Sequence, residues 1–263
     1  ICGVGIMPGD AAMRDALAPQ DNLYTILSRG QSTNELRVCG AIVKYLLAPD
    51  DPEAVLAQMA DAATRIVSLT ITEKGYCAKD LGAMILDVSN AAVQHDSANP
   101  HAPKTALGFL VAALSRRRAA GQQPFTVLSC DNLQGNGTTA RALTLAMAEA
   151  MAPALGAAGE GLASWISSSV KFPNTMVDRI TPATTAEVRA TVDGALGLED
   201  AWPVVAEDFA QWVIEDEFTL GRPPWEKAAP VGAASAALLV KDVVPYVSDR
   251  IKHTHSARKP PSA

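Results

Sequence analysis

Short β-prone runs alternate with longer alanine- and leucine-rich stretches along the whole chain, and this alternation constrains the fold most. Strands are predicted at residues 1–6, 36–46, 65–72, 125–130, 170–172 and 202–206, the second of them paired with the run 23–30 before it. Helices are predicted at residues 11–17, 52–60, 105–119, 138–151 and 162–168. Strands that alternate with helices imply βαβ crossovers. The sequence therefore predicts an α/β fold, with a mostly parallel sheet and helices on both faces.

The composition excludes several classes of function. The chain of 263 residues has a net charge of −6 and a sequence pI near 5.2, with both signs scattered along it. No basic stripe is available to neutralise a phosphate backbone, so nucleic acid is not expected as a partner. The longest apolar runs are far too short to cross a bilayer, so no membrane partner is expected. The four cysteines lie far apart without a zinc-ligand spacing, which indicates a reduced, cytoplasmic protein.

The end of the first predicted strand, CGVGIMPGD, is the first place where a site is expected, because ligands of open parallel sheets bind outside the carboxyl ends of the strands. Gly3 and Gly5 resemble the start of a dinucleotide fingerprint, but no third glycine follows at the required spacing. Asp10 stands just past the strand and directly before a helical segment. Its carboxylate can bind an adenosine ribose and repel the 2′-phosphate of NADP, or it can cap the helix. The sequence leaves both interpretations open.

The second unusual strand end is SLTITEKGYC, where polar and apolar residues alternate up to Thr72 and Glu73. A solvated turn explains the Glu-Lys-Gly sequence. The alternative, which assigns a function, is that Glu73 is an acid on the cofactor side of the sheet.

The third strand end is FTVLSCDNLQGNG, which places a carboxylate and two amides within six positions. Asn132 and Asn136 lie between a buried strand and a helix predicted to start near Thr138, where unpaired backbone N–H groups converge. An asparagine amide can stabilise a developing alkoxide without adding net charge. An Asx-turn with Gly137 at a positive φ is the simpler alternative, and it explains one asparagine only.

Other charged and metal-ligating residues are predicted to have no role in a site. Arg116–Arg118 are most simply cations in the last turn of a helix, where they complement its dipole. His253 and His255 stand two residues apart in a polar tail without a third ligand, so no metal site is expected there. His95 and His101 belong to a loop-like stretch.

Several stretches together resemble the polyol-specific long-chain dehydrogenase family, and most closely its mannitol-oxidising members. They are CGVGIMPGDAAMRDALAPQDNLYT, RIVSLTITEKGYC, FTVLSCDNLQGNG, KFPNTMVDRITP, AWPVVAEDFAQWVIEDEF and GRPPWEK, which span Ile1 to Lys227 in this order. SCDNLQGNG and FPNTMVDRITP are the most distinctive of them.

The resemblance implies a metal-independent, NAD-dependent oxidation of a polyol such as D-mannitol to D-fructose, and the reverse reduction. It implies a Rossmann-like NAD-binding domain over residues 1–240. Asp10 matches the acid that selects NAD over NADP, and Thr72, Glu73 and Asn132 fall on the cofactor side of their strand ends. Asn136 matches the amide that helps to bind the reactive oxygen.

The chain departs from the family pattern near both ends. A glycine-rich strand and an Arg-x-His that cradle the pyrophosphate would lie before Ile1, so the domain is expected to be truncated there. The family has its catalytic lysine in a Lys-x4-Asn-x2-His motif after Pro-Tyr-Glu. Here Val247 follows Pro245-Tyr246, and Arg250 stands at the lysine position. Arginine keeps its proton and cannot act as the base.

Residues 241–263 are therefore expected to be a remnant or divergent start of a C-terminal helical catalytic domain, and turnover by this chain is expected to be impaired. Lys252 lies nearby but does not restore the motif. Two alternatives stay open. One is a non-catalytic nucleotide-binding fragment. The other is a sugar-acid reductase of the same superfamily, acting on fructuronate or tagaturonate.

Overall fold

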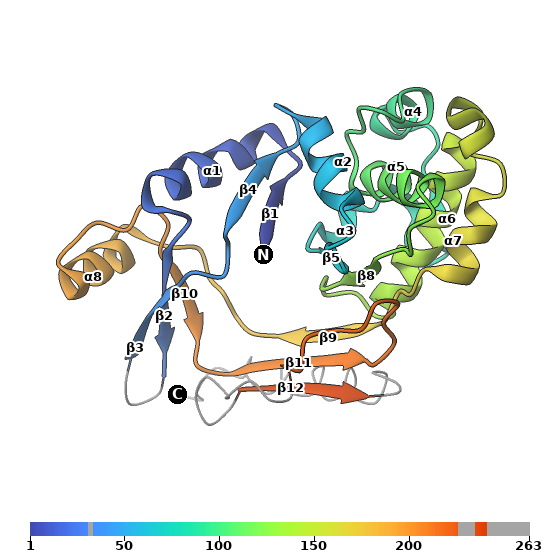
Figure 1. The fold of residues 1–263 in the computed structure, drawn as a ribbon. Coiled ribbons are helices and arrows are strands. Elements are labelled where there is room, and N and C mark those ends of the chain that lie inside the picture. The colour runs from blue at the N-terminus through green and yellow to red at the C-terminus, as the bar shows by residue number, and fades with distance from the viewer. Residues whose placement is uncertain (31–33, 226–234, 241–263) are drawn as a thin grey trace. The chain divides into compact units, whose positions relative to one another are not determined.

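The computed structural model describes residues 1–30, 34–225 and 235–240, and the chain divides into two compact units (Figure 1). The first unit consists mainly of Ile1–Ala57 and Arg179–Ala210, and the second mainly of Gln58–Asp178. Helix α2 (Pro52–Ala60) begins in the first unit and ends in the second. Each unit combines a parallel strand pair with helices, which confirms the predicted α/β class.

Strand β1 (Cys2–Gly5) pairs in parallel with β4 (Lys44–Leu47) in the first unit. The 3-10 helix η1 (Pro8–Asp10) and helix α1 (Ala11–Leu17) follow β1. Gly3 lies opposite Tyr45, and a Cβ at Gly3 would come within 2.7 Å of the Tyr45 ring. A Cβ at Gly5 would come within 2.9 Å of the Tyr45 hydroxyl oxygen. The two glycines therefore make room for a tyrosine in a strand pair.

A second sheet of the first unit has the order β10–β2–β3. Its strands are β10 (Val204–Glu207), β2 (Tyr24–Arg29) and β3 (Asn34–Cys39), with β10 parallel and β3 antiparallel to β2. Helix α8 (Ala186–Leu196) packs Val188 and Val192 against Leu27 and Val205. The pairing of residues 23–30 with the next strand is confirmed. The single strand predicted at 36–46 is wrong, because β3 ends at Cys39 and β4 joins the other sheet.

A buried carboxylate, Asp200, ties this sheet to the loop before β10. Only 5% of Asp200 is exposed, and its oxygens accept hydrogen bonds from Thr25 N (2.6 Å), Gln20 Nε2 (2.9 Å) and Trp202 N (2.8 Å). The Gln20 side chain also accepts from Ala201 N at 3.0 Å. One carboxylate therefore joins residues 20–25 to the loop that precedes β10, two segments that are distant in sequence.

Acid is expected to weaken the Asp200 network. Burial by itself raises the pKa of Asp200, but the hydrogen bonds from Gln20, Trp202 and Thr25 outweigh it and hold the pKa below its usual value. Because the pKa is lowered in the folded state, the stabilisation is present above the unfolded pKa of about 3.9 and is lost as the pH falls through the folded pKa. The difference in free energy of unfolding between the parent and Asp200→Asn should therefore be constant near neutral pH and shrink below about pH 4. Urea titrations across a pH series measure it.

Glu199→Gln supplies the control, because Glu199 is the exposed neighbour in the same loop and loses the same charge. If both variants change the pH dependence equally, net charge rather than the Asp200 network is responsible.

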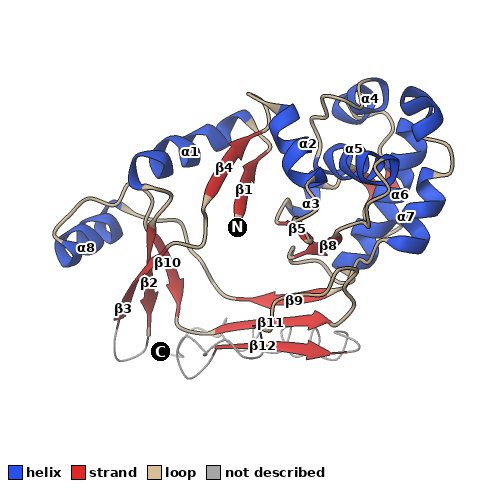
Figure 2. Ribbon diagram, in the orientation of Figure 1, coloured by secondary structure: helices blue, strands red, loops and turns tan. Residues whose placement is uncertain are grey.

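Strand β5 (Ile66–Leu69) pairs in parallel with β8 (Thr126–Ser129) in the second unit, and every residue of β8 is buried. Figure 2 shows helices gathered beside this pair. They are α4 (Ala91–Ala98), α5 (Ala106–Ala119), α6 (Asn136–Leu155) and α7 (Leu162–Ser169). The unit also contains the short α3 (Thr72–Gly75), η3 (Gly156–Ala158) and the pair β6 (Ala78–Asp80) and β7 (Ile85–Leu86). A three-stranded sheet has the order β12–β11–β9, with β12 (Ser235–Val240), β11 (Ala210–Glu215) and β9 (Thr175–Asp178).

No single helix among the described residues is long and apolar enough to cross a membrane. Residues 136–158 and helix α7 meet the requirements of length and composition only as a pair, and the chain bends by 111° between them.

The strand predicted at residues 170–172 does not form. Lys171 accepts one backbone hydrogen bond from Val127 N at 3.0 Å, but Pro173 has no N–H to continue a ladder. The N–H of Asn174 is directed to the Glu215 side chain at 2.7 Å. The strand β9 begins only at Thr175.

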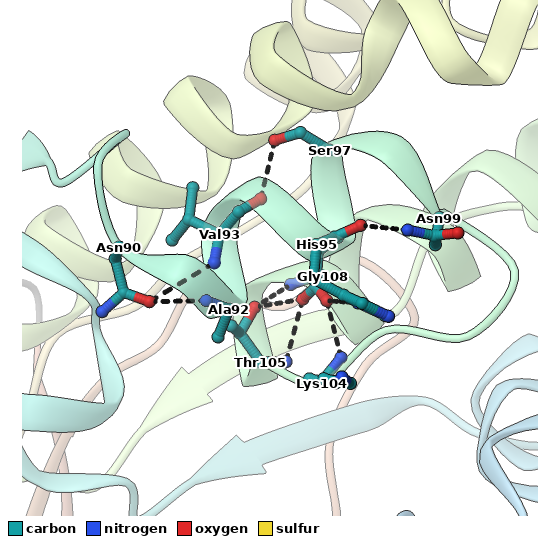
Figure 3. Close-up of polar contacts among 10 residues, drawn as sticks. Asn90, Ala92, Val93, His95, Ser97, Asn99, Lys104, Thr105 and Gly108 are labelled. Carbon is teal, nitrogen blue, oxygen red and sulfur yellow. Dashed lines mark hydrogen bonds and ion pairs between the residues drawn. The ribbon is translucent and has the colours of Figure 1, made fainter.

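Helix α4 contains His95, so the prediction of a loop there is wrong. The N-cap Asn90 accepts hydrogen bonds from Ala92 N and Val93 N (Figure 3). Asp96, the next residue after His95, is fully buried. Its carboxylate accepts from Lys104 N (2.7 Å), Thr105 N (2.9 Å) and Thr105 Oγ1 (2.7 Å). Its Oδ1 also lies 3.1 Å from Nδ1 of His95.

The same network starts helix α5. Thr105 is its N-cap and accepts from Gly108 N at 2.9 Å, as Figure 3 shows. Any side chain at position 108 would overlap Asp96 Oδ2. A buried carboxylate, a threonine cap and a glycine therefore form one interlocked unit.

The three arginines predicted in the last turn of a helix do lie there, but Arg117 is only 1% exposed. Its guanidinium donates to the carbonyl oxygens of Thr64 (2.7 Å), Gln123 (3.0 Å) and Asp61, and it lies over the Phe125 ring. Burial lowers the pKa of Arg117. Arg117 is therefore a buried cross-link between loops as well as a cation near the end of the helix.

Candidate functional site

Asp10 ends the 3-10 turn that follows β1, in the first unit. Its Oδ2 accepts hydrogen bonds from Ile6 N and Met7 N, both at 2.8 Å. Asp10 is the N-cap residue of α1 but makes no side-chain capping hydrogen bond to that helix. Its carboxylate instead caps the preceding 3-10 turn through Met7 N, so the capping interpretation holds for η1 and not for α1. Oδ1 has no hydrogen-bond partner among the described residues. The turn thus holds the carboxylate at the strand end with one oxygen available to a ligand.

Gly5 allows this arrangement. A Cβ at Gly5 would lie 2.6 Å from the Cβ of Asp10 and 3.0 Å from a methyl group of Leu47. The glycine is therefore needed for the close approach of the acid to the strand. Gly3 and Gly5 thus allow close packing in this stretch, whereas a Cβ at Gly9 would meet no atom within 4 Å.

Thr72 and Glu73 form the first residues of α3, directly after β5 in the second unit. Thr72 has a φ of +60°, which is a rare conformation for a β-branched residue. Glu73 is exposed and has no hydrogen-bond partner among the described residues. A strained backbone that presents a free carboxylate at a strand end is typical of functional sites.

Asp131 lies at the end of the neighbouring strand β8 and is 7% exposed. Its Oδ1 accepts from Thr72 N at 2.8 Å, and its Oδ2 accepts from the Tyr76 hydroxyl at 2.8 Å. Tyr76 is fully buried, and its hydroxyl also lies 2.6 Å from Ser129 Oγ. These contacts bring the two predicted strand ends, β5 and β8, together.

The two asparagines of this stretch differ in their surroundings. Asn136 is fully buried, and its Nδ2 donates to Ser129 O (3.1 Å), Asp131 O (3.0 Å) and Thr175 Oγ1 (3.0 Å). Its Oδ1 accepts from Gly137 N (2.8 Å) and Thr175 N (2.9 Å). Asn132 is exposed. The predicted role of Asn136 at the reactive oxygen stays a prediction, and neither N–H of its amide is available for that role in this arrangement.

The simpler alternative for this turn placed a positive φ at Gly137, which is wrong. Gly135 has the positive φ, +64°, and Gly137 is the second residue of α6. Gly137 lies so close to the Phe172–Asn174 segment that a Cβ would be 2.5 Å from the carbonyl oxygens of Phe172 and Pro173. Asn174 Oδ1 accepts from Thr138 N at 3.0 Å. The start of α6 is thus locked to the segment before β9.

Sequence reasoning noted the Asp131 carboxylate at this strand end without giving it a role, and it missed Tyr76, Asn174 and Thr175 as parts of this region. A signal was present for Asn174 and Thr175, because both belong to FPNTMVDRITP. That stretch is among the most distinctive of the chain. Nothing in the spacing of Tyr76 shows that its hydroxyl reaches Asp131.

Arg250, Lys252, His253 and His255 lie outside the described residues. Within the described ranges, no group of three or more His, Cys, Asp or Glu side chains could hold a metal ion.

Each unit by itself therefore carries polar groups at strand ends, half-buried in the first unit and exposed in the second. The first has the Asp10 carboxylate, and the second has Glu73 and Asn132 next to the Asp131 network. Carboxylates suit the hydroxyl groups of a ribose or a sugar, and amides suit a carbonyl or alkoxide oxygen.

Residues 1–227 match the family model described as the mannitol dehydrogenase Rossmann domain. The chain belongs to the mannitol dehydrogenase family. The match covers every strand end discussed above, so the Rossmann-like fold class is established together with the family.

Relatives within the family are similar over most of this chain. A mannitol 2-dehydrogenase of Aspergillus clavatus is 49% identical over 229 residues, which are 86% of this chain and 44% of that protein. One of Aspergillus terreus is 46% identical over 262 residues, covering 98% of this chain and 50% of that protein. The chain thus spans about half the length of the curated relatives it matches.

Two solved structures of similar proteins agree with the fold. The mannitol 2-dehydrogenase of Pseudomonas fluorescens, in a ternary complex with NAD and D-mannitol, is 45% identical with a TM-score of 0.86. The match covers 95% of this chain and 48% of that chain. A D-sorbitol dehydrogenase in substrate-free form is also 45% identical, with a TM-score of 0.85, over 95% of this chain and 49% of the other.

Proposed function

We propose that this chain is the NAD-binding part of a polyol dehydrogenase that interconverts D-mannitol and D-fructose in the cytoplasm. The family match over residues 1–227 supports the reaction class, and two of the similar structures are those of a mannitol and a sorbitol dehydrogenase. The single observation that carries the cofactor choice is Asp10, whose Oδ1 is unpartnered among the described residues.

Asp10 is proposed to bind the adenosine ribose. The hydrogen bonds from Ile6 N and Met7 N fix Oδ2, so Oδ1 can accept from a ribose hydroxyl. A 2′-phosphate at the same place would be a like-charge contact. The residues present therefore fit NAD, and NADP fits them poorly.

Thr72, Glu73 and Asn132 are proposed to line the cofactor side of the second unit. Asn132 is also the better candidate for contact with a bound substrate oxygen, because it is exposed and Asn136 is buried with its amide engaged. In this proposal Asn136 holds the β8 turn against Thr175. NAD supplies the hydride acceptor when it is bound, and these side chains orient the reacting groups.

Removal of the substrate hydroxyl proton is proposed to be the step that this chain catalyses poorly. Residues 1–240 are proposed to form the NAD-binding domain, and residues 241–263 the divergent start of a catalytic domain. Arg250 stands where the family has its lysine. A positioned base contributes about 10²–10⁴-fold to such a step, and arginine cannot supply it. Cofactor binding is therefore a better first test than turnover, and a nucleotide-binding protein without activity is the alternative.

The cofactor proposal predicts that the chain binds NADH more tightly than NADPH, and that Asp10→Asn narrows this preference by about fivefold or more. That factor follows from a like-charge contact worth ~1 kcal/mol in a solvated site. Asparagine keeps an oxygen to accept from Ile6 N and Met7 N, so the turn should survive. Titration of nucleotide fluorescence with each cofactor measures the two dissociation constants.

Asp15→Asn is the matched control, because it removes the same charge from an exposed position on α1. It should leave the preference unchanged. Equal affinity of the parent for NADH and NADPH would refute the role of Asp10.

A further inference from the structure

One carboxylate, that of Asp131 at the end of β8, holds the turn that follows β5 in place. Asp131 Oδ1 accepts from Thr72 N, where the turn begins, and Oδ2 accepts from the Tyr76 hydroxyl, where the turn ends. Both bonds are 2.8 Å long, and Asp131 is 7% exposed. The carboxylate therefore clamps both ends of residues 72–76.

The conformation that the clamp holds is one that threonine disfavours. Thr72 has a φ of +60°, and Cys77, just past the turn, has a φ of +50°. Strained conformations of this kind persist only where the surroundings fix them. The N-cap of α3, Ile71, makes no side-chain capping hydrogen bond, and Glu73 and Lys74 are exposed. Among the described contacts, the Asp131 carboxylate is the group that fixes the N–H of Thr72.

Tyr76 is the hydrogen-bond donor at the second end of this clamp. Burial raises the pKa of Tyr76, and the charge of Asp131 raises it further, so the phenol keeps its proton. Ser129 Oγ, 2.6 Å from the hydroxyl oxygen, can donate to it while the Tyr76 hydroxyl donates to Asp131. The hydroxyl groups of Tyr76 and Ser129 and the Asp131 carboxylate thus have hydrogen-bond partners within the second unit.

We propose that Asp131 is a positioning residue, whose carboxylate holds residues 72–76 in the strained conformation that presents Glu73 to the cofactor. The last step, contact with a cofactor, rests on the proposed function. The clamp itself does not, because all of its atoms lie in the second unit of this chain.

The test compares the parent with Asp131→Asn in two measurements. Hydrogen–deuterium exchange reports the amides of residues 73–77, with α5 as an internal reference. Fluorescence titration reports the dissociation constant for NADH. An asparagine keeps one acceptor oxygen and loses the charge. Exchange of the turn should therefore rise about tenfold and NADH should bind about tenfold more weakly, as for the loss of one hydrogen bond to a charged group.

Thr72→Gly distinguishes positioning from a general structural role. Glycine adopts a positive φ without strain, so the turn needs the clamp less when residue 72 is glycine. In the Thr72→Gly background, Asp131→Asn should change the exchange of the turn and the dissociation constant for NADH by about threefold or less each. A double-mutant cycle measures this coupling. Asp61→Asn is the control, since Asp61 is an exposed carboxylate that accepts a backbone N–H elsewhere in the same unit. It should change neither measurement.

The outcomes separate the two proposals. If the parent binds no NADH, the proposed function fails, and the exchange data alone decide the clamp. Unchanged exchange at residues 73–77 in a folded Asp131→Asn protein overturns the inference, and so does an equal cost in the Thr72→Gly background. If Asp131→Asn does not fold, Tyr76→Phe replaces it. That variant removes one of the two donors, and faster exchange confined to the turn supports the clamp, whereas no change overturns it.

Discussion

Gly137→Ala is expected to lower the free energy of unfolding by ~3 kcal/mol or more, although it adds a single methyl group. The new Cβ would lie 2.5 Å from the carbonyl oxygens of both Phe172 and Pro173. These are backbone atoms, so no side chain can turn aside to make room. The start of α6 would have to move away from the segment before β9, and the hydrogen bonds of Asn136 to Thr175 would be lost with it. Urea unfolding followed by circular dichroism measures the loss.

Gly194→Ala is the matched control, because Gly194 is also inside a helix and a methyl group added there would meet no neighbouring atom within 4 Å. Alanine in place of an unconstrained helical glycine should stabilise by up to about 1 kcal/mol. If the two substitutions have the same sign, the close approach at Gly137 does not matter for stability.

Asp96→Ala is the second substitution with a large expected effect, a loss of about 3–5 kcal/mol. It removes the acceptor for Lys104 N, Thr105 N and Thr105 Oγ1, and it leaves a cavity at a residue that is 0% exposed. Unpaired buried donors cost about 1–3 kcal/mol each when they cannot reach water. Thermal and urea unfolding should both show the loss, and α5 should lose protection from hydrogen exchange at its first turn.

Two variants make this test specific. Asp96→Asn keeps an oxygen in place and should cost less than alanine. Asp87→Ala removes an exposed carboxylate that accepts from Ser89 and should have a much smaller effect. Equal losses for Asp96→Ala and Asp87→Ala would contradict the importance of the buried network.

Elements with strong local signals are predictable from the sequence. The predicted bounds of α1 and α2 agree with the structure. Helix α2 has Pro52 and Glu53 in its first turn, a local signal for the start of a helix. Helix α4 was missed because its residues AAVQHDSA have no clear apolar face, and only the cap Asn90 marks its start. Strands β9 and β11 were missed because their pairing joins segments far apart in sequence.

The candidate site was predictable in its location and less so in its contacts. The sequence places Asp10, Thr72, Glu73 and Asn132 at strand ends, and the structure finds them there. It could not show which of Asn132 and Asn136 faces the interior. That depends on the left-handed Gly135, which redirects the chain before α6. Whether these residues bind NAD stays a prediction.

The inward Asp131 and the outward Asn132 are adjacent in the chain, and this has a consequence for the engineering of new specificity. A library that randomises position 132 while keeping Asp131 would vary the surface offered to a ligand without altering the support beneath it. A library that randomises position 131 while keeping Asn132 would change the residue that fixes the turn, and the groups that the turn positions would shift with it. Substitutions at two consecutive residues should therefore have different consequences, a loss of the turn conformation at position 131 and a change in ligand preference at position 132.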